Sequence, residues 1–236
     1  MCTLHDGRIL LVHDRDIAAF DPSRMDWTRR TRLGHARRGA TLIALPDDDV
    51  VVVGGGDDGT PPIVTIHIDE NGDATSEPWK SSLASDLRHA SGIVLNSREA
   101  LVVGGESRGS STTQGWVLDL RERTVRDIAP LPIPGGIARA TLVRIDDRVL
   151  VLGGETVEHR FPTAPANGAV LRPPWDRPLV LDGPPVEVVR SMSFPAARGG
   201  TVLGGYRFDP TAARDRRIQV HRDAFELVLP VFAIVD

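Results

Sequence analysis

Four arginines recur along the chain at nearly constant intervals of 50, 51 and 51 residues: Arg38, Arg88, Arg139 and Arg190. Guanidinium groups that converge form a site for a carboxylate, a phosphate or an acidic peptide. Arg37 and His89 stand directly beside two of them. Two interpretations stay open: a positively charged site for an acidic ligand, or arginines that each bond to backbone carbonyls of the neighbouring repeat.

Two glutamates at matching positions are candidate acid and base groups. Glu106 and Glu155 each follow a Gly-Gly pair directly. A carboxyl group held beside a substrate transfers protons in general acid–base catalysis, so these residues would serve an enzyme that acts on a small acidic molecule. The alternative is a solvated carboxylate at the start of a loop. The sequence contains no nucleophile elbow, phosphate-binding loop or metalloprotease motif.

The histidines and the cysteine predict no metal site. Seven histidines are spread along the chain without the close spacing of zinc ligands, and Cys2 is the only cysteine, which also excludes an internal disulfide. The segment DENGDA, residues 69–74, lacks the downstream glutamate of an EF-hand, and its Asn-Gly pair favours a hairpin turn. We therefore expect neither a metal nor another cofactor.

Two irregular segments, residues 156–180 and 206–220, combine aromatic residues with arginine and proline. Arginine and aromatic residues are enriched at interface hot spots, and binding residues gather in loops on rigid scaffolds. One interpretation is a recognition face with four aromatic anchors: Phe161, Trp175, Tyr206 and Phe208. The other interpretation is variable, solvated loops.

The elements that would position these residues belong to a repeat of about 50 residues. Apolar runs end in Gly-Gly pairs whose first glycines are residues 54, 104, 153 and 204. Each unit has short segments rich in Val, Ile and Leu, bounded by Gly, Pro, Asp or Asn, which are strand and hairpin signals. No window shows a sustained helical period. We therefore predict an all-β protein of four-stranded antiparallel sheets, in which the glycines permit sharp turns and close packing.

These residues resemble the kelch family of β-propellers, whose hallmark is Gly-Gly after a hydrophobic strand. The segment AFDPSRMDW, residues 19–27, is also similar to the later aromatic stretch of that family. The resemblance covers nearly the whole chain and implies one propeller domain, residues 1–236. We predict five four-stranded blades: residues 1–34 with 231–236, 35–84, 85–134, 135–187 and 188–230.

The propeller prediction makes two further statements about the chain. DGRILLVHD, IAAFDPS and DWTRRTRL are interpreted as strands two, three and four of the first blade, and VFAIVD at the C-terminus as the strand that closes it. Closure of this kind hides two sheet edges. Because the first strand of a blade lies innermost, the periodic arginines would face one mouth of the central channel. A fragment of a larger propeller is the alternative.

The resemblance also bears on redox chemistry. Copper-radical oxidases that share the kelch fold need tyrosine ligands and a tyrosine linked to cysteine. Tyr206 is the sole tyrosine of this chain, so the sequence excludes that chemistry.

The composition is that of an ordinary globular protein, with 41% hydrophobic and 25% charged residues. A net charge of -4 gives no general attraction to nucleic acid or to anionic membranes. No stretch approaches the roughly 20 apolar residues of a membrane helix, and no signal-peptide core is present. These features favour a cytoplasmic protein.

Three functions are compatible with these patterns. The first is a non-enzymatic scaffold that binds a protein or an acidic peptide through blade loops and the Arg-lined channel mouth. The second is a small-molecule enzyme such as a sugar isomerase or mutarotase, activities that the kelch resemblance also implies. The third is a subunit whose function needs another chain.

Overall fold

The structure, a computed structural model, describes residues 1–27, 31–69, 74–158, 161–163, 165, 167–182, 192–196, 199–203, 206–208, 218–220 and 224–228. The regular secondary structure in these ranges consists only of β-strands. The predicted all-β class is therefore confirmed for the part of the chain that is described. The chain divides into two compact units, Met1–Arg108 with Gly115–Asp127 and Gly109–Gln114 with Ile128–Asp236. The combination of both units into one ring stays a prediction.

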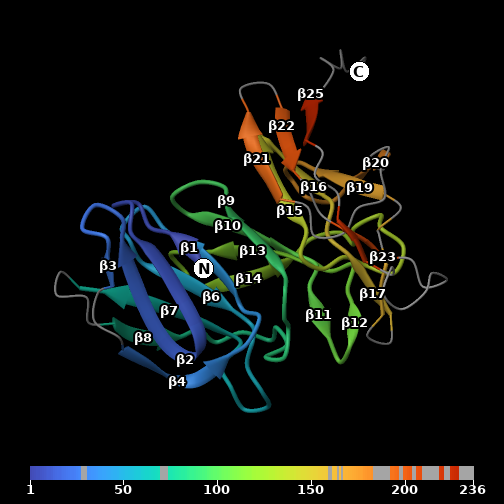
Figure 1. Cartoon of the computed structure of the whole chain (residues 1–236). Helices are drawn as coiled ribbons and strands as arrows, with labels where there is room; N and C mark the ends of the chain where they lie inside the picture. The colour runs from blue at the N-terminus through green and yellow to red at the C-terminus, as the bar shows by residue number, and fades with distance from the viewer. Residues whose placement is uncertain are drawn as a thin grey trace. The chain divides into compact units, whose positions relative to one another are not determined.

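The first unit contains three four-stranded antiparallel sheets, coloured from blue to green in Figure 1. The first sheet consists of β1 (Cys2–Thr3), β2 (Ile9–Asp21), β3 (Asp26–Trp27) and β4 (Thr31–Arg37). The second consists of β5 (Thr41–Ala44), β6 (Val50–Val53), β7 (Ile63–Ile68) and β8 (Ala74–Pro78), paired in that order. The third consists of β9 (Ser91–Val94), β10 (Glu99–Val103), β13 (Gly115–Asp119) and β14 (Thr124–Asp127).

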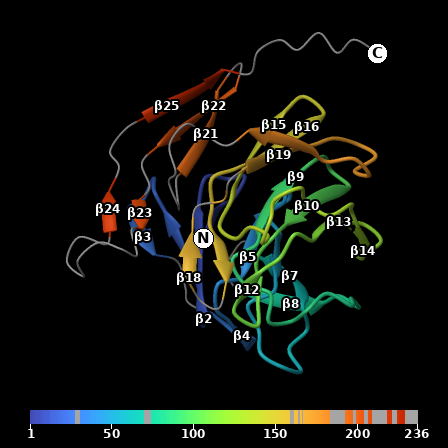
Figure 2. The ribbon, with the colours of Figure 1, turned by 90° about the vertical axis from the view of Figure 1, so that its right-hand side faces the viewer.

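The second unit contains a four-stranded sheet, a three-stranded sheet and two hairpins, shown from yellow to red in Figure 2. The four-stranded sheet consists of β15 (Thr141–Ile145), β16 (Arg148–Leu152), β19 (Asn167–Leu171) and β20 (Leu179–Asp182). The three-stranded sheet consists of β21 (Met192–Ala196), β22 (Gly199–Leu203) and β25 (Ala224–Val228). The hairpins are β17 (Thr156–Glu158) with β18 (Phe161–Thr163) and β23 (Tyr206–Phe208) with β24 (Ile218–Val220).

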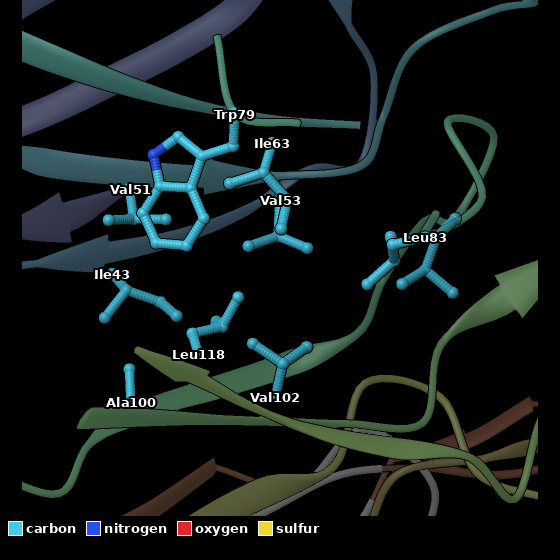
Figure 3. Packing of buried hydrophobic residues seen from close by; sticks show 10 residues of the cluster. Ile43, Val51, Val53, Ile63, Trp79, Leu83, Ala100, Val102 and Leu118 are labelled. Carbon is cyan, nitrogen blue, oxygen red and sulfur yellow. The ribbon is translucent and has the colours of Figure 1, made fainter. Parts of the chain in front are cut away.

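Strand β6 explains the apolar run of four valines. Val50 and Val52 belong to the core between the first and second sheets, whereas Val51 and Val53 belong to the core between the second and third. Figure 3 shows Val51 and Val53, beneath Trp79, facing the third-sheet residues Ala100, Val102 and Leu118. Because alternate side chains of a strand point to opposite faces and both faces are covered, every position of β6 is apolar.

The glycine pairs lie at the ends of β6, β10 and β16 and have the left-handed conformation that the sequence predicted. The φ angles are 70° and 75° for Gly54 and Gly55, 63° and 105° for the pair at 104, and 59° and 82° for the pair at 153. A Cβ on Gly54 would overlap with the backbone carbonyl oxygen of Leu87. The architectural role is therefore confirmed for three pairs, and the pair at 204 lies outside the described residues.

The strand assignment at the two ends of the chain was wrong in part. The two strands expected from DGRILLVHD and IAAFDPS form one strand, β2, of 13 residues, and β1 precedes it. Asp14, with a φ of 55°, lies at an irregularity in the pairing of β2 with β4, so the strand bends there without ending.

In the last sheet, β25 pairs directly with β22, so the described part of this sheet has three strands rather than the four predicted for each blade. The reason is that Ile218–Val220 pairs with Tyr206–Phe208 in a separate hairpin and does not join the sheet. Residues 231–236, predicted to close the first blade, lie outside the described residues.

Candidate functional site

Arg38 and Arg88 occupy equivalent places in neighbouring sheets of the first unit. The Arg38 amide donates a hydrogen bond to the Gly55 carbonyl at 2.7 Å, and the Arg88 amide donates to the Glu106 carbonyl at 2.8 Å. Each arginine therefore lies just before the first strand of its sheet and beside the residues that follow the second strand. Backbone hydrogen bonds set the positions of both residues, so these positions do not depend on the identity of the side chain.

The guanidinium groups of both residues form exposed ion pairs. Arg38 Nε lies 2.9 Å from Asp14 Oδ1, with side-chain exposures of 71% and 41%. Arg88 Nη2 lies 3.2 Å from Asp57 Oδ1, with exposures of 40% and 81%. The Nε atom of Arg88 is buried and has no hydrogen-bond partner among the described residues. Since solvent screens exposed pairs, each contributes about 0–1 kcal/mol to stability, and an external carboxylate can replace the internal one.

His89 packs the third sheet against the second. Its amide donates a hydrogen bond to the Gly39 carbonyl at 2.6 Å, and a Cβ on Gly39 would lie 2.6 Å from Cε1 of the His89 ring. Gly39, His89 and Arg139 have φ angles of 69°, 56° and 54°, so these three are the equivalent positions of successive repeats. Arg139 therefore lies one residue beyond the positions of Arg38 and Arg88.

Arg139 and Glu155 form an ion pair inside the second unit. Arg139 Nη1 bonds to Glu155 Oε1, and the glutamate side chain is only 1% exposed. The backbones of Ala138 and Glu155 exchange two hydrogen bonds of 2.8 Å, as those of Arg88 and Glu106 do in the first unit. The carboxylate is thus used within the unit, whereas Glu106 is half-buried. Convergence of all four periodic arginines stays a prediction, and Arg190 lies outside the described residues.

The structure places the predicted aromatic anchors in different surroundings. Trp175 is 5% exposed and its carbonyl accepts a hydrogen bond from the Ala129 amide at 3.0 Å, so its ring belongs to the interior of the second unit. Phe161 begins β18, and Tyr206 and Phe208 are the ends of β23. The side chains of these three residues lie outside the description.

No feature of the sequence separates Arg37 from the neighbouring arginine, yet Arg37 is the buried one. It is 3% exposed, and its Nη1 donates a hydrogen bond of 2.9 Å to the Gly54 carbonyl. Burial lowers the pKa of its guanidinium to about 10. Arg37 is the last residue of β4 and Arg38 directly follows the strand. Only the packing of the sheets decides which of the two side chains is buried.

A polar network joins the second and third sheets. His67 Nδ1 lies 2.6 Å from Asp49 Oδ2, and Glu77 forms an ion pair with Arg123. Burial raises the pKa of Asp49, and the hydrogen bond from Arg123 lowers the pKa of Glu77. The four residues are far apart in the sequence and carry no motif, so sequence reasoning missed this network.

The described residues contain neither a metal-ligand cluster nor a membrane-spanning helix. No group of three or more His, Cys, Asp or Glu side chains in this part of the chain can hold a metal ion. No helix in the described ranges has the length and apolar character of a membrane span.

Comparison with known proteins finds a similarity in fold but none in sequence. No family model and no curated protein sequence matches the chain. A solved structure of a fungal alcohol oxidase of the AA5 family, in complex with copper, is similar over 92% of this chain with a TM-score of 0.65 and 16% identity. The chain spans half of that enzyme, since the similarity covers 50% of its length. At this identity the likeness is one of fold alone.

Proposed function

We propose that the chain is a kelch-type β-propeller and a non-enzymatic interaction module that binds an acidic segment of a protein partner. Repeated antiparallel sheets with left-handed glycine pairs support the architecture. The binding surface is formed by Arg38, Arg88 and His89, which precede the first strands of the second and third sheets. A cytoplasmic location and membership of a larger complex belong to the same proposal.

The equivalent places of Arg38 and Arg88 carry this proposal. Both side chains remain partly exposed, and both present guanidinium groups whose internal partners are exposed aspartates. A carboxylate of the partner replaces Asp14 or Asp57 at little cost, because the exchanged pairs have similar strength.

The enzyme alternative has less support. As an acid or base, Glu155 would have to face a substrate, and its carboxylate is instead bound to Arg139 in the interior of the second unit. The backbones of Glu106 and Arg88 exchange two hydrogen bonds, which connect the segment before β9 to the segment after β10. The geometry therefore favours a structural role for Glu155, whereas the hydrogen bonds described for Glu106 involve its backbone.

A copper centre like that of a copper-radical oxidase does not fit this chain. The sequence has one tyrosine and one cysteine, and the described residues hold no trio of His, Cys, Asp or Glu side chains suited to a metal ion. We therefore do not propose an oxidase activity for this chain on the basis of the similarity in fold.

A fluorescein-labelled oligoglutamate peptide tests the proposal by fluorescence anisotropy. We expect the intact chain to bind this peptide and the Arg38→Glu/Arg88→Glu variant to bind it at least about tenfold more weakly. The matched control is Arg98→Glu/Arg126→Glu, because Arg98 and Arg126 are also exposed ion-paired arginines, with side-chain exposures of 59% and 57%. Equal losses in both variants, or binding unchanged in the first, would reject the surface.

A further inference from the structure

Strand β4 contains a bulge that opens a pocket between the first and second sheets. Asp14 of β2 pairs with Arg37, and Asp16 pairs with Arg32, so residues 33–36 lie opposite the single residue Arg15. Arg15 holds the bulge open at its base, since Nε and Nη2 donate hydrogen bonds to the carbonyls of Leu33 and Gly34 at 3.3 and 2.7 Å. Bulges of this kind redirect side chains and are common beside binding sites.

The pocket has a volume of about 220 Å³ and an amphipathic lining. Buried residues form its base: Leu33, Arg37 and Val64. Its rim carries exposed polar groups, His35 and Ser76, together with two prolines. The lining contains two basic side chains and no acidic one. All of these residues lie in the first unit.

The charge of Arg37 is not compensated by the described residues. The hydrogen bond to the Gly54 carbonyl uses Nη1, and no carboxylate of the described residues forms an ion pair with this guanidinium. Asp14 is the backbone partner of Arg37, but its carboxylate is bound to Arg38 instead. Burying a cation without a counter-ion is costly, so the fold retains at this pocket a group whose natural complement is an anion.

We infer that the Arg37 pocket binds a small organic carboxylate, whose anionic group pairs with Arg37 and whose short aliphatic stem lies against Leu33, Val64 and the rim prolines. A planar guanidinium accommodates a carboxylate through two parallel hydrogen bonds. The apolar part of the base favours an aliphatic stem over a fully hydrated ion. The volume is below the roughly 300–1,000 Å³ of typical ligand pockets, which limits the ligand to a few carbon atoms.

This inference goes beyond the proposed acidic-partner surface. That surface uses the exposed Arg38 and Arg88, whereas the pocket uses Arg37, the last residue of β4, which is buried. Either proposal can therefore fail without the other, because the probes and the substituted residues differ.

Isothermal titration calorimetry of the full chain with butyrate tests the inference, with butyramide as the neutral isostere. We expect butyrate to bind with a Kd below about 1 mM and butyramide to give no measurable heat of binding. In Arg37→Met, butyrate should bind at least about tenfold more weakly, because the charge-assisted hydrogen bonds are lost. Methionine replaces the buried charge by an apolar chain, so the variant is expected to fold.

Two controls make the result specific to the pocket. Arg32→Met removes an exposed guanidinium from the same strand, with 80% of its side chain exposed, and should leave butyrate binding unchanged. Ser76→Trp blocks the rim while keeping Arg37 and should abolish binding. Equal binding of butyrate and butyramide, unchanged binding in Arg37→Met, absence of butyrate binding by the intact chain, or tighter binding of inorganic phosphate than of butyrate would each overturn the inference.

Discussion

The backbone carbonyl oxygen of Leu87 occupies the position that a Cβ on Gly54 would need. The same oxygen accepts a hydrogen bond of 2.7 Å from the Gly55 amide. The glycine after β6 is therefore required by two independent constraints, its left-handed backbone and the close approach of the segment that leads to the third sheet. The second sheet and the segment before the third sheet are therefore in direct backbone contact at this point.

Replacing Gly54 by alanine should destabilise the chain strongly. The φ of 70° costs an L residue about 1–2 kcal/mol, and relieving the overlap with a backbone atom costs about 1–3 kcal/mol more. Urea unfolding measures the loss. Gly34→Ala is the control, since a Cβ there has no neighbour within 4 Å, and should change stability by less than about 0.5 kcal/mol. Similar midpoints for the two variants would contradict the packing described for Gly54.

The buried indole of Trp79 depends on one hydroxyl group. Its Nε1 donates a hydrogen bond of 2.8 Å to Thr65 Oγ1 within the second sheet. Thr65→Val keeps the shape of the side chain and leaves the indole N–H unsatisfied, so the free energy of unfolding should fall by about 1–3 kcal/mol. Thr75→Val, on the exposed strand β8, provides the control. A stable Thr65→Val variant would show that the indole finds another acceptor.

The ion pair of Arg139 and Glu155 should be structural. Arg139→Met leaves the carboxylate of a 1% exposed glutamate without this guanidinium, and such a loss typically costs about 3–5 kcal/mol. The double variant Arg139→Met/Glu155→Leu removes both charges and should recover most of that stability. Chemical denaturation of the single and double variants measures the coupling. Additive losses in the double variant would speak against the pair as the cause.

The thiol of Cys2 should react slowly in the folded chain. Burial raises its pKa from 9.0 to about 11, and only the thiolate is nucleophilic. At pH 8 iodoacetamide should therefore alkylate the native chain on the order of tenfold to a hundredfold more slowly than the chain in urea.

The rate for the native chain should keep rising with pH up to about 11. The raised pKa also contributes stability that is present below pH 9 and lost as the pH rises towards 11. Mass spectrometry follows one product, because the chain has a single cysteine. Equal rates in the native and unfolded chains would contradict the burial of this thiol.

The sequence predicted the repeated elements well because their signals are local. The strands β5, β6, β9, β10, β15 and β16 lie where short apolar runs alternate with polar turns, and the glycines that follow adopt positive φ. The prediction failed in β2, where an Asp with a left-handed backbone bends a strand that the pattern divides in two. It also failed in the last sheet, which has three described strands rather than four, because β24 pairs with β23 in a separate hairpin.

The candidate functional residues likewise divide into those that local spacing predicted and those whose surroundings depend on distant segments. Spacing alone found Arg38 and Arg88, since a repeat carries equivalent residues to equivalent places, but it matched Arg139 to them although backbone pairing aligns it with His89. The burial of Trp175 was not visible in a segment rich in proline and arginine. The burial of a side chain and the pairing of a strand depend on which sheets pack together. The sequence of a single strand does not specify these neighbours.

The all-β class, four of the four-stranded sheets and the glycine turns follow from the amino-acid sequence alone, since each depends on side-chain alternation and backbone conformation within a few residues. The burial of Arg37, the exposure of Arg38 and the ion pair of Asp14 with Arg38 depend instead on how the sheets pack together. The two arginines have identical side chains and are neighbours in the chain, so their burial depends on which of them the packed sheets cover. The contact between the first two sheets, together with the bulge opposite Arg15, made one of two neighbouring arginines a buried cation beside a pocket.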